Sequence, residues 1–306
     1  MTRRSARKHP LITIGVCAKN GEDYIREAIE SIIDQDFPHE LMEVIFVDDG
    51  SQDRTLSIIE NYVPKMKTQV KVFHQQWKGL GFARQVVTNN AKGKYIIWVD
   101  CDMILSRDFV KRQLDFMEKN PVVAIGKGRY GFLQTNLVGS LENMEFMTEN
   151  MKRMDKTDLT PLGTGGSIYL VEAIRGIGGF DEHIQGSGED ADVESRVKAA
   201  GWSLRTTSAV FYERRRKTWK SLWNEYFWHG KGGSHILERN QQLVESYKLF
   251  LPVLFSIELL RVASAYKLTY QKKALLLPLH YSFKRIAWFL GFLASLLENN
   301  NKRYTK

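Results

Sequence analysis

The sequence predicts an α/β fold in which a mainly parallel sheet is flanked by helices. Strands and helices alternate four times over about the first 130 residues, and the strands are apolar, β-branched runs typical of strands buried on both faces. Acidic residues also gather where strands end: Asp48 and Asp49 close one strand, and Asp100 and Asp102 close another. Ligands of such sheets bind beyond the carboxyl ends of the strands, so this edge is the expected site.

The expected elements follow in order along the chain. The first strand, 11–18, is a short apolar run that gives way at once to a polar turn, so it is not interpreted as a signal peptide. A helix over 21–35 follows, with apolar residues at a spacing of three and four. The next elements are a strand over 42–51, a helix over 51–63 with Ser51 or Asp53 as N-cap, a strand over 70–75, a helix over 81–93, a strand over 94–103, a helix over 107–120 and a strand over 122–130.

Beyond about residue 135 the alternation fades into a glycine-rich segment that carries charges at fixed points. Within it, a helix over 189–201 is expected from the apolar spacing of Val193, Val197 and Ala200. Asp190 then lies at the N-terminal end of that helix and faces the site rather than the core.

Composition limits the partners that the chain can have. A length of 306 residues suits one large domain, or one domain with an appendage. The net charge of +9 indicates an anionic partner: nucleic acid, a membrane surface or a phosphorylated substrate. The two cysteines, Cys17 and Cys101, form no CxxC motif, which argues against a zinc site or disulfide framework and fits a reducing compartment.

The Asp100–Asp102 pair suggests a divalent cation. In an extended chain, residues two apart point to the same side, so these carboxylates would repel each other unless a cation lay between them. Mg²⁺ and Mn²⁺ prefer carboxylate and phosphate oxygens, and a metal that bridges a diphosphate stabilises a departing nucleotide. Taken alone, either acidic pair is better explained as a strand-end or helix cap.

Five segments in a fixed order resemble the family 2 glycosyltransferases: "AKNGEDYI", "FVDDGSQD", "GFARQVVTNNAKGKYIIWVDCD", "IGGFDE" and "GEDADVESRVKAAG". The similarity runs from about Leu11 to about Gly233. It implies the GT-A (Rossmann-like) fold and a metal-dependent, inverting transfer of a sugar from a UDP- or GDP-sugar to an acceptor hydroxyl. The motifs specify neither the sugar nor the acceptor.

The resemblance also implies roles for individual residues. Asp100 and Asp102 match the DxD motif, in which the second aspartate usually binds the metal directly. Asp190 matches the catalytic base, with Glu189 as the alternative. The residues implied to bind the nucleotide sugar are Ala18, Lys19, Asn20 and Glu22 around the base and ribose, Asp49 on the base, Arg84 and Asp100 near the diphosphate, and Gly165 and Gly166 beside the sugar and acceptor.

The chain departs from the family pattern in one place. Many relatives have a histidine about twenty residues after the base, as a further metal or phosphate contact, whereas this chain has Tyr212 and Glu213 there. His229 is the candidate for that contact, although a lone histidine is more often structural. The arginines at 214–216 are either diphosphate contacts or a solvated basic surface.

The C-terminal region is expected to be helical and membrane-associated. Charged residues and prolines interrupt its apolar stretches, 249–266 and 274–298, so helices in the membrane interface fit better than spanning helices. The basic residues expected to face lipid headgroups are Lys272, Lys273, Lys284 and Arg285. The alternative is that these helices cover the catalytic domain or form a dimer interface.

These expectations together give a catalytic domain over 1–240 and a membrane-associated region over 241–306, on the cytoplasmic face of the cell membrane. The expected acceptor is a lipid-linked glycan or polysaccharide precursor. One alternative is a sugar-phosphate nucleotidyltransferase, but the first strand lacks the glycine-rich basic loop usual in that class. The other alternative is a basic nucleic-acid-binding protein, which the acidic edge of the sheet argues against.

Overall fold

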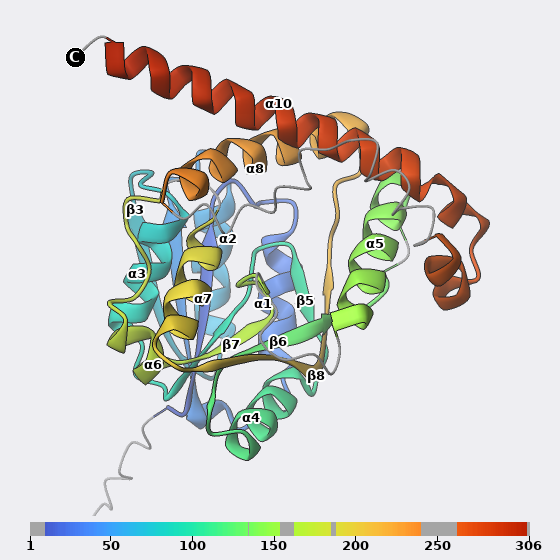
Figure 1. Ribbon diagram of the computed structural model, residues 1–306. Helices are drawn as coiled ribbons and strands as arrows, with labels where there is room; N and C mark the ends of the chain where they lie inside the picture. Colours follow the sequence, from blue (N-terminus) through green and yellow to red (C-terminus); the bar gives the residue numbers. More distant parts are fainter. Residues whose placement is uncertain (1–9, 134, 154–161, 185–187, 240–261, 305–306) are drawn as a thin grey trace, which may run out of the picture.

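The computed structural model describes residues 10–133, 135–153, 162–184, 188–239 and 262–304. Its centre is an eight-stranded sheet in the order β3-β2-β1-β4-β7-β6-β8-β5 (Figure 1). The strands are β1 (Ile12–Ala18), β2 (Met42–Asp49), β3 (Gln69–Gln75), β4 (Tyr95–Trp98), β5 (Met103–Leu105), β6 (Val123–Tyr130), β7 (Ser167–Leu170) and β8 (Ser203–Glu213). Strands β1 to β4 pair in parallel, as do β6 and β8, whereas β7 is antiparallel to both of its neighbours and β5 to β8. The predicted α/β class is confirmed, with a mixed sheet.

Helices flank this sheet in two groups, α1 with α2, and α3 with α6 and α7. The helices are α1 (Ile25–Ile33), α2 (Thr55–Tyr62), α3 (Leu80–Asn90), α4 (Phe109–Lys119), α5 (Leu137–Arg153), α6 (Val171–Gly176), α7 (Glu189–Ala199), α8 (Trp219–Arg239), a helix over 262–269, and α10 (Leu277–Tyr304). Short 3₁₀ turns are η1 (His39–Leu41), η2 (Val63–Lys65) and η5 (Lys272–Leu276).

The core forms around the central strands. Ile12, Ile14 and Val16 of β1 are fully buried between β2 and β4. The apolar face of α1 packs on this core through the positions that its helical spacing predicts, including Ile25 and Ile29. Burying each such side chain stabilises the fold by about 1.5–3 kcal/mol, so the ends of β1 and β4 are held firmly where the acidic residues begin.

Two local predictions are wrong. The strand expected over 94–103 stops at Trp98, because β4 pairs with β1 whereas β5 pairs with β8 at the far edge of the sheet. The chain must turn between them, and the Met103 backbone N–H donates to the Asp100 carbonyl at 3.0 Å. The helix expected from residue 51 begins at Thr55, and its N-cap position, Arg54, makes no side-chain cap.

The described part of the C-terminal region packs on the rest of the molecule. Helix α10 crosses α8 (Figure 1), and the backbones approach closely because Gly230 and Gly291 lie at the crossing, where a Cβ atom would overlap the partner helix. Lys284 is buried, and its Nζ lies 2.9 Å from Glu142 and 2.6 Å from Glu145 on α5. The expectation that Lys284 faces lipid headgroups is therefore wrong, since two buried carboxylates draw it inward.

No helix in the described ranges is long and apolar enough to cross a membrane. The stretch expected over 249–266 lies mostly outside the described residues. In the other stretch, Pro278 is the second residue of α10. Backbone N–H groups in the first turn of a helix have no hydrogen-bond partner within the helix, so a proline there breaks no helical hydrogen bond.

Candidate active site

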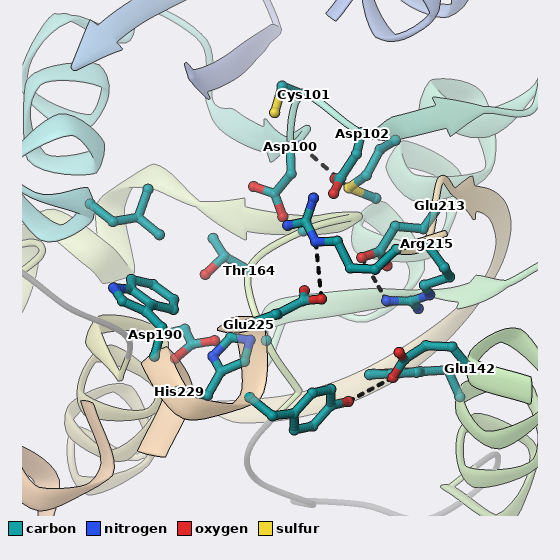
Figure 2. A pocket seen from close by; sticks show the side chains of 18 of the residues that line it. Asp100, Cys101, Asp102, Glu142, Thr164, Asp190, Glu213, Arg215, Glu225 and His229 are labelled. Atoms are coloured by element: carbon teal, nitrogen blue, oxygen red, sulfur yellow. Dashed lines mark hydrogen bonds and ion pairs between the residues drawn. The ribbon is translucent and has the colours of Figure 1, made fainter. Parts of the chain in front are cut away.

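A cavity of about 940 Å³ opens beside the ends of β1 and β4 and contains most of the predicted catalytic residues. Asp100, Asp102 and Asp190 all line it, although 88 residues separate the last two in the chain (190 − 102). Figure 2 shows them on facing walls, with Thr164 of the glycine-rich loop between them. The pocket therefore joins the predicted metal-binding pair to the predicted base.

Asp102 lies in the turn after β4, where it meets other carboxylates. Burial raises its pKa to about 8, with further contributions from the negative charges of Glu213 and Asp100. Glu213 lies close because it ends β8 opposite Met103 of β5, and the Arg214 N–H donates to the Asp102 carbonyl at 2.8 Å. The sequence analysis gave Glu213 no role, because only the β5–β8 pairing brings it to this turn.

Asp100 and Asp102 are the residues that could hold a divalent cation together with a phosphorylated ligand. Within the described ranges, no group of three His, Cys, Asp or Glu side chains could hold a metal by itself. Mg²⁺ commonly binds through one or two carboxylates and completes its shell with substrate phosphates and water. A cation here would offset the cost of ionising Asp102 among neighbouring negative charges.

Arg84 links the two sides of the pocket. Its guanidinium, only 5% exposed, forms an ion pair with Glu189 of α7 and lies 3.5 Å from Asp100. Glu189 is thereby neutralised and buried, whereas Asp190, the next residue, has no ion pair among the described residues. Of the two candidate bases, Asp190 is the one whose carboxylate remains available to a substrate.

The glycine-rich loop forms the floor between Asp100 and Asp190. Gly165 leaves no room for a side chain, because a Cβ atom would overlap the Asp100 carboxylate, and Gly163 has a φ of +81°. Glu194 of α7 accepts hydrogen bonds from the backbone N–H groups of Leu162 and Gly163, each at 2.8 Å. The loop is thus held at a fixed distance from both acids.

A buried lysine holds the same loop from the other side. Lys127 of β6 donates to the backbone oxygen of Gly165 and is 3% exposed. Sequence reasoning missed Lys127 and Glu194, because a lysine in a strand and a glutamate in a helix carry no motif. The signal that could have drawn attention to Lys127 is a charge that follows the apolar start of β6, at Val123–Ile125.

The three consecutive arginines have different environments. Arg214 pairs with Glu27 of α1, at 2.6 Å, and is not among the described residues that line the pocket, which does not support its suggested contact with the diphosphate. Arg215 lines the pocket, pairs with Glu213 at 2.6 Å, and has its Nε and one Nη buried without a hydrogen-bond partner among the described residues. Arg216, also in the wall, pairs with Glu225 of α8 at 3.0 Å.

The predicted nucleotide residues lie beside this pocket, at the ends of β1 and β2. Asn20 has a φ of +51°, and its side-chain oxygen accepts from the Gln52 backbone. Glu22 accepts from the Arg54 side chain and backbone, both at 3.0 Å. These bonds join the loop over 18–22 to the loop that follows Asp49 of β2, and Asp49 itself is buried.

Helices α8 and α10 close the remaining wall. His229 lines the pocket with Tyr226 and Trp228, and burial lowers its pKa. From α10, Trp288 reaches the same cavity. This packing agrees with the alternative in which the C-terminal helices cover the catalytic domain, although a helical apolar pattern did not indicate that Trp288 lines the site.

Comparison with known proteins places this chain in a family. The family model described as "Glycosyl transferase family 2" matches residues 13–178, more than half of the chain. An uncharacterized glycosyltransferase of Haemophilus influenzae is 32% identical over 144 residues, which are 45% of this chain and 56% of that protein. The poly(ribitol-phosphate) beta-N-acetylglucosaminyltransferase TarS of Staphylococcus aureus is 35% identical over 101 residues, 33% of this chain and 18% of that protein. The chain thus spans about half of the first relative and about a fifth of the second.

Solved structures share the fold over nearly the whole chain. The mannosyltransferase PcManGT of Pyrobaculum calidifontis, in complex with GDP-Man and Mn²⁺, has a TM-score of 0.64 at 16% identity and covers 95% of this chain and 88% of its own. S. aureus TarS 1–349 with UDP-GlcNAc has a TM-score of 0.54 at 17% identity and covers 94% and 92%. The fold predicted from the motifs is confirmed, and the chain belongs to glycosyl transferase family 2, with the GT-A fold.

Proposed function

We propose that the protein is a metal-dependent, inverting glycosyltransferase that uses a UDP- or GDP-sugar. The observation that carries this proposal is the charge distribution of the pocket. Its carboxylates at Glu189, Glu213 and Glu225 are each paired with an arginine, whereas Asp102 and Asp190 have no ion pair among the described residues. Two acids without an ion pair, on facing walls, suit a cation on one side and proton transfer on the other.

In the proposed reaction, the acceptor oxygen attacks the anomeric carbon of the donor sugar as the bond to the diphosphate oxygen breaks. Asp190 accepts the proton of the acceptor hydroxyl. A base opposite the leaving group implies a single displacement, and hence inversion. A divalent cation held by Asp100 and Asp102 would supply Lewis-acid stabilisation of the nucleoside diphosphate as it departs.

The donor class rests on family membership. A structural neighbour binds GDP-Man with Mn²⁺ and another binds UDP-GlcNAc, which supports a nucleotide sugar without choosing between the two bases. Family membership also favours this proposal over a sugar-phosphate nucleotidyltransferase or a nucleic-acid-binding protein.

Binding experiments test this proposal directly. UDP or GDP with Mn²⁺ is expected to raise the melting temperature of the full chain, since a ligand that binds only the folded state stabilises it. A single-stranded oligonucleotide of equal charge is expected to leave it unchanged. The proposal fails if neither nucleotide binds, or if the oligonucleotide stabilises the protein as well as they do.

We also propose that α10 rests on the cytoplasmic face of the cell membrane and presents the pocket to a lipid-linked glycan or polysaccharide precursor. The support is the outer face of α10. Leu279 and Leu297 are each 66% exposed, and Ile286, Leu290 and Leu293 lie exposed between them. Tyr270 and Lys272 lie at the start of this face, where an aromatic ring and a cation suit anionic headgroups.

Flotation of the full chain with liposomes tests this second proposal. The wild type is expected to float with anionic vesicles, and the double change Leu279→Glu/Leu297→Glu to stay in solution. Val122→Glu is the matched control, because Val122 is 62% exposed and lies apart from α10. If all three proteins behave alike, the membrane proposal is wrong, and light scattering then shows whether the same face joins two copies of the chain.

A further inference from the structure

An exposed tryptophan lies next to the surface that the resemblance gives to the nucleobase. Trp77 follows β3 in the loop that leads into α3, and 52% of its surface is open to solvent. An exposed indole offers a large apolar face that a planar ligand could cover. The sequence analysis gave this residue no role, because a single tryptophan in a polar loop matches no motif.

Asp49 fixes the loop that carries this tryptophan. Its carboxylate accepts three hydrogen bonds, from the Gln75 side chain at 2.8 Å and from the backbone N–H groups of Lys78 and Gly79 at 2.9 Å each. Gly50, with a φ of +76°, lies under the loop, and a Cβ atom there would come within 2.7 Å of the Trp77 nitrogen. The backbone on both sides of Trp77 is therefore anchored.

Lys19 brings the other predicted nucleotide segment to the same ring. Its Nζ lies over the indole, 4.4 Å from the ring centre, in a cation–π contact. The loop over 18–22 therefore contacts Trp77 through Lys19. Asp49, in turn, accepts hydrogen bonds from the backbone of the loop that carries Trp77. Because three hydrogen bonds already engage Asp49, its contribution to base recognition includes positioning this loop.

We propose that Trp77 is a stacking platform for the nucleobase of the donor, with Lys19 beside it. This inference rests on the proposed use of a nucleotide sugar and names the chemical class that the surface binds: a planar, aromatic base attached to a diphosphate. Stacking on an indole accepts any base, because every base has a π face. The platform therefore supplies affinity, and hydrogen bonds from other groups choose between uracil and guanine.

Fluorescence and calorimetry on the full chain test the platform. UDP and GDP are expected to quench tryptophan emission in the wild type, whereas pyrophosphate, which has no base, is expected to bind without that quenching. Trp77→Ala is expected to weaken UDP and GDP binding about 5- to 140-fold, which is the ~1–3 kcal/mol lost when a stacking aromatic is replaced by alanine. Its affinity for pyrophosphate is expected to stay at the wild-type value.

Two further variants make the test specific. Trp77→Phe keeps an aromatic face, so it is expected to bind UDP with nearly wild-type affinity but without the quenching. Trp219→Phe is the matched control, since Trp219 is 38% exposed on α8 and packs on Phe283 of α10. It is expected to keep both binding and quenching.

The outcomes separate the two proposals. If the wild type binds neither UDP nor GDP, the nucleotide-sugar function itself fails. If it binds them but Trp77→Ala binds equally well, or the quenching survives in Trp77→Phe, the platform assignment is wrong and the function stands. Circular dichroism and melting temperature show whether each variant is folded.

Discussion

The guanidinium of Arg84 forms an ion pair with Glu189, the residue next to Asp190 at the start of α7. This pairing gives the two neighbouring acids different properties. Glu189 balances a buried cation, and Asp190 is left to accept a proton.

Exchanging each acid for its amide is expected to separate these roles. Asp190→Asn is expected to keep the melting temperature and nucleotide binding but to lose turnover by about 10²-fold or more, because the amide cannot accept the proton. Glu189→Gln is expected to lower the melting temperature, since it leaves Arg84 buried without its counter-charge. Melting curves and single-turnover sugar transfer measure both, and normal turnover in Asp190→Asn would show that the base lies elsewhere.

Asp102→Asn is expected to make the metal-free protein more stable and to abolish metal binding. The substitution removes a carboxylate that burial and nearby negative charges keep hard to ionise, and it removes the predicted direct metal ligand as well. Electron paramagnetic resonance of Mn²⁺ in the presence of UDP or GDP measures the binding. Asp115→Asn, an exposed change on α4, serves as the control. Undiminished Mn²⁺ affinity in Asp102→Asn, or full wild-type activity in excess chelator, would refute the metal assignment.

Lys284→Met is expected to destabilise the protein by about 3–5 kcal/mol, because it leaves the buried carboxylates of Glu142 and Glu145 without their cation. Urea unfolding measures the loss. Lys267→Met, an exposed lysine in the helix over 262–269, is expected to change the free energy of unfolding by less than about 0.5 kcal/mol. Adding Glu142→Gln and Glu145→Gln to Lys284→Met is expected to recover part of the loss, and no recovery would mean that packing rather than charge explains it.

Glu194 is expected to make the protein less stable as the pH rises. Burial, and secondarily the charge of Asp190, raises its pKa to about 8 from an ordinary value of 4.5. Between these two pH values the folded state binds more protons than the unfolded state. The free energy of unfolding that this raised pKa contributes is therefore fully present below about pH 4.5 and is lost as the pH rises through about 8.

Glu194→Gln tests this pH dependence. In the wild type, the two side-chain oxygens of Glu194 accept hydrogen bonds from the backbone N–H groups of Leu162 and Gly163. The glutamine has an NH₂ group in place of one oxygen, so it loses one of these hydrogen bonds and is expected to be about 1 kcal/mol less stable at pH 5. That deficit is expected to shrink or reverse by pH 8.5, because the amide never ionises. Glu118→Gln, exposed on α4, is expected to stay parallel to the wild type. A deficit that is constant with pH would contradict the assignment.

Sequence alone determined the elements whose signals are local. The apolar runs of β1 and β2, the helical spacing of α1 and α7, and the acidic residues at Asp49, Asp100 and Asp190 are all readable in a one-dimensional pattern, because each signal spans a few neighbouring residues. The ordered motifs then implied the family and the fold, and the family match and the structural likeness confirm both.

Tertiary structure alone decided what meets these residues. Glu213 reaches Asp102 through the pairing of β8 with β5, and Lys127 meets the glycine-rich loop from β6. Lys284 turns inward because two carboxylates on α5 offset the cost of burying its charge. Partners that lie tens of residues to more than a hundred residues apart leave no periodic pattern in the sequence, because packing and charge in the folded chain bring them together.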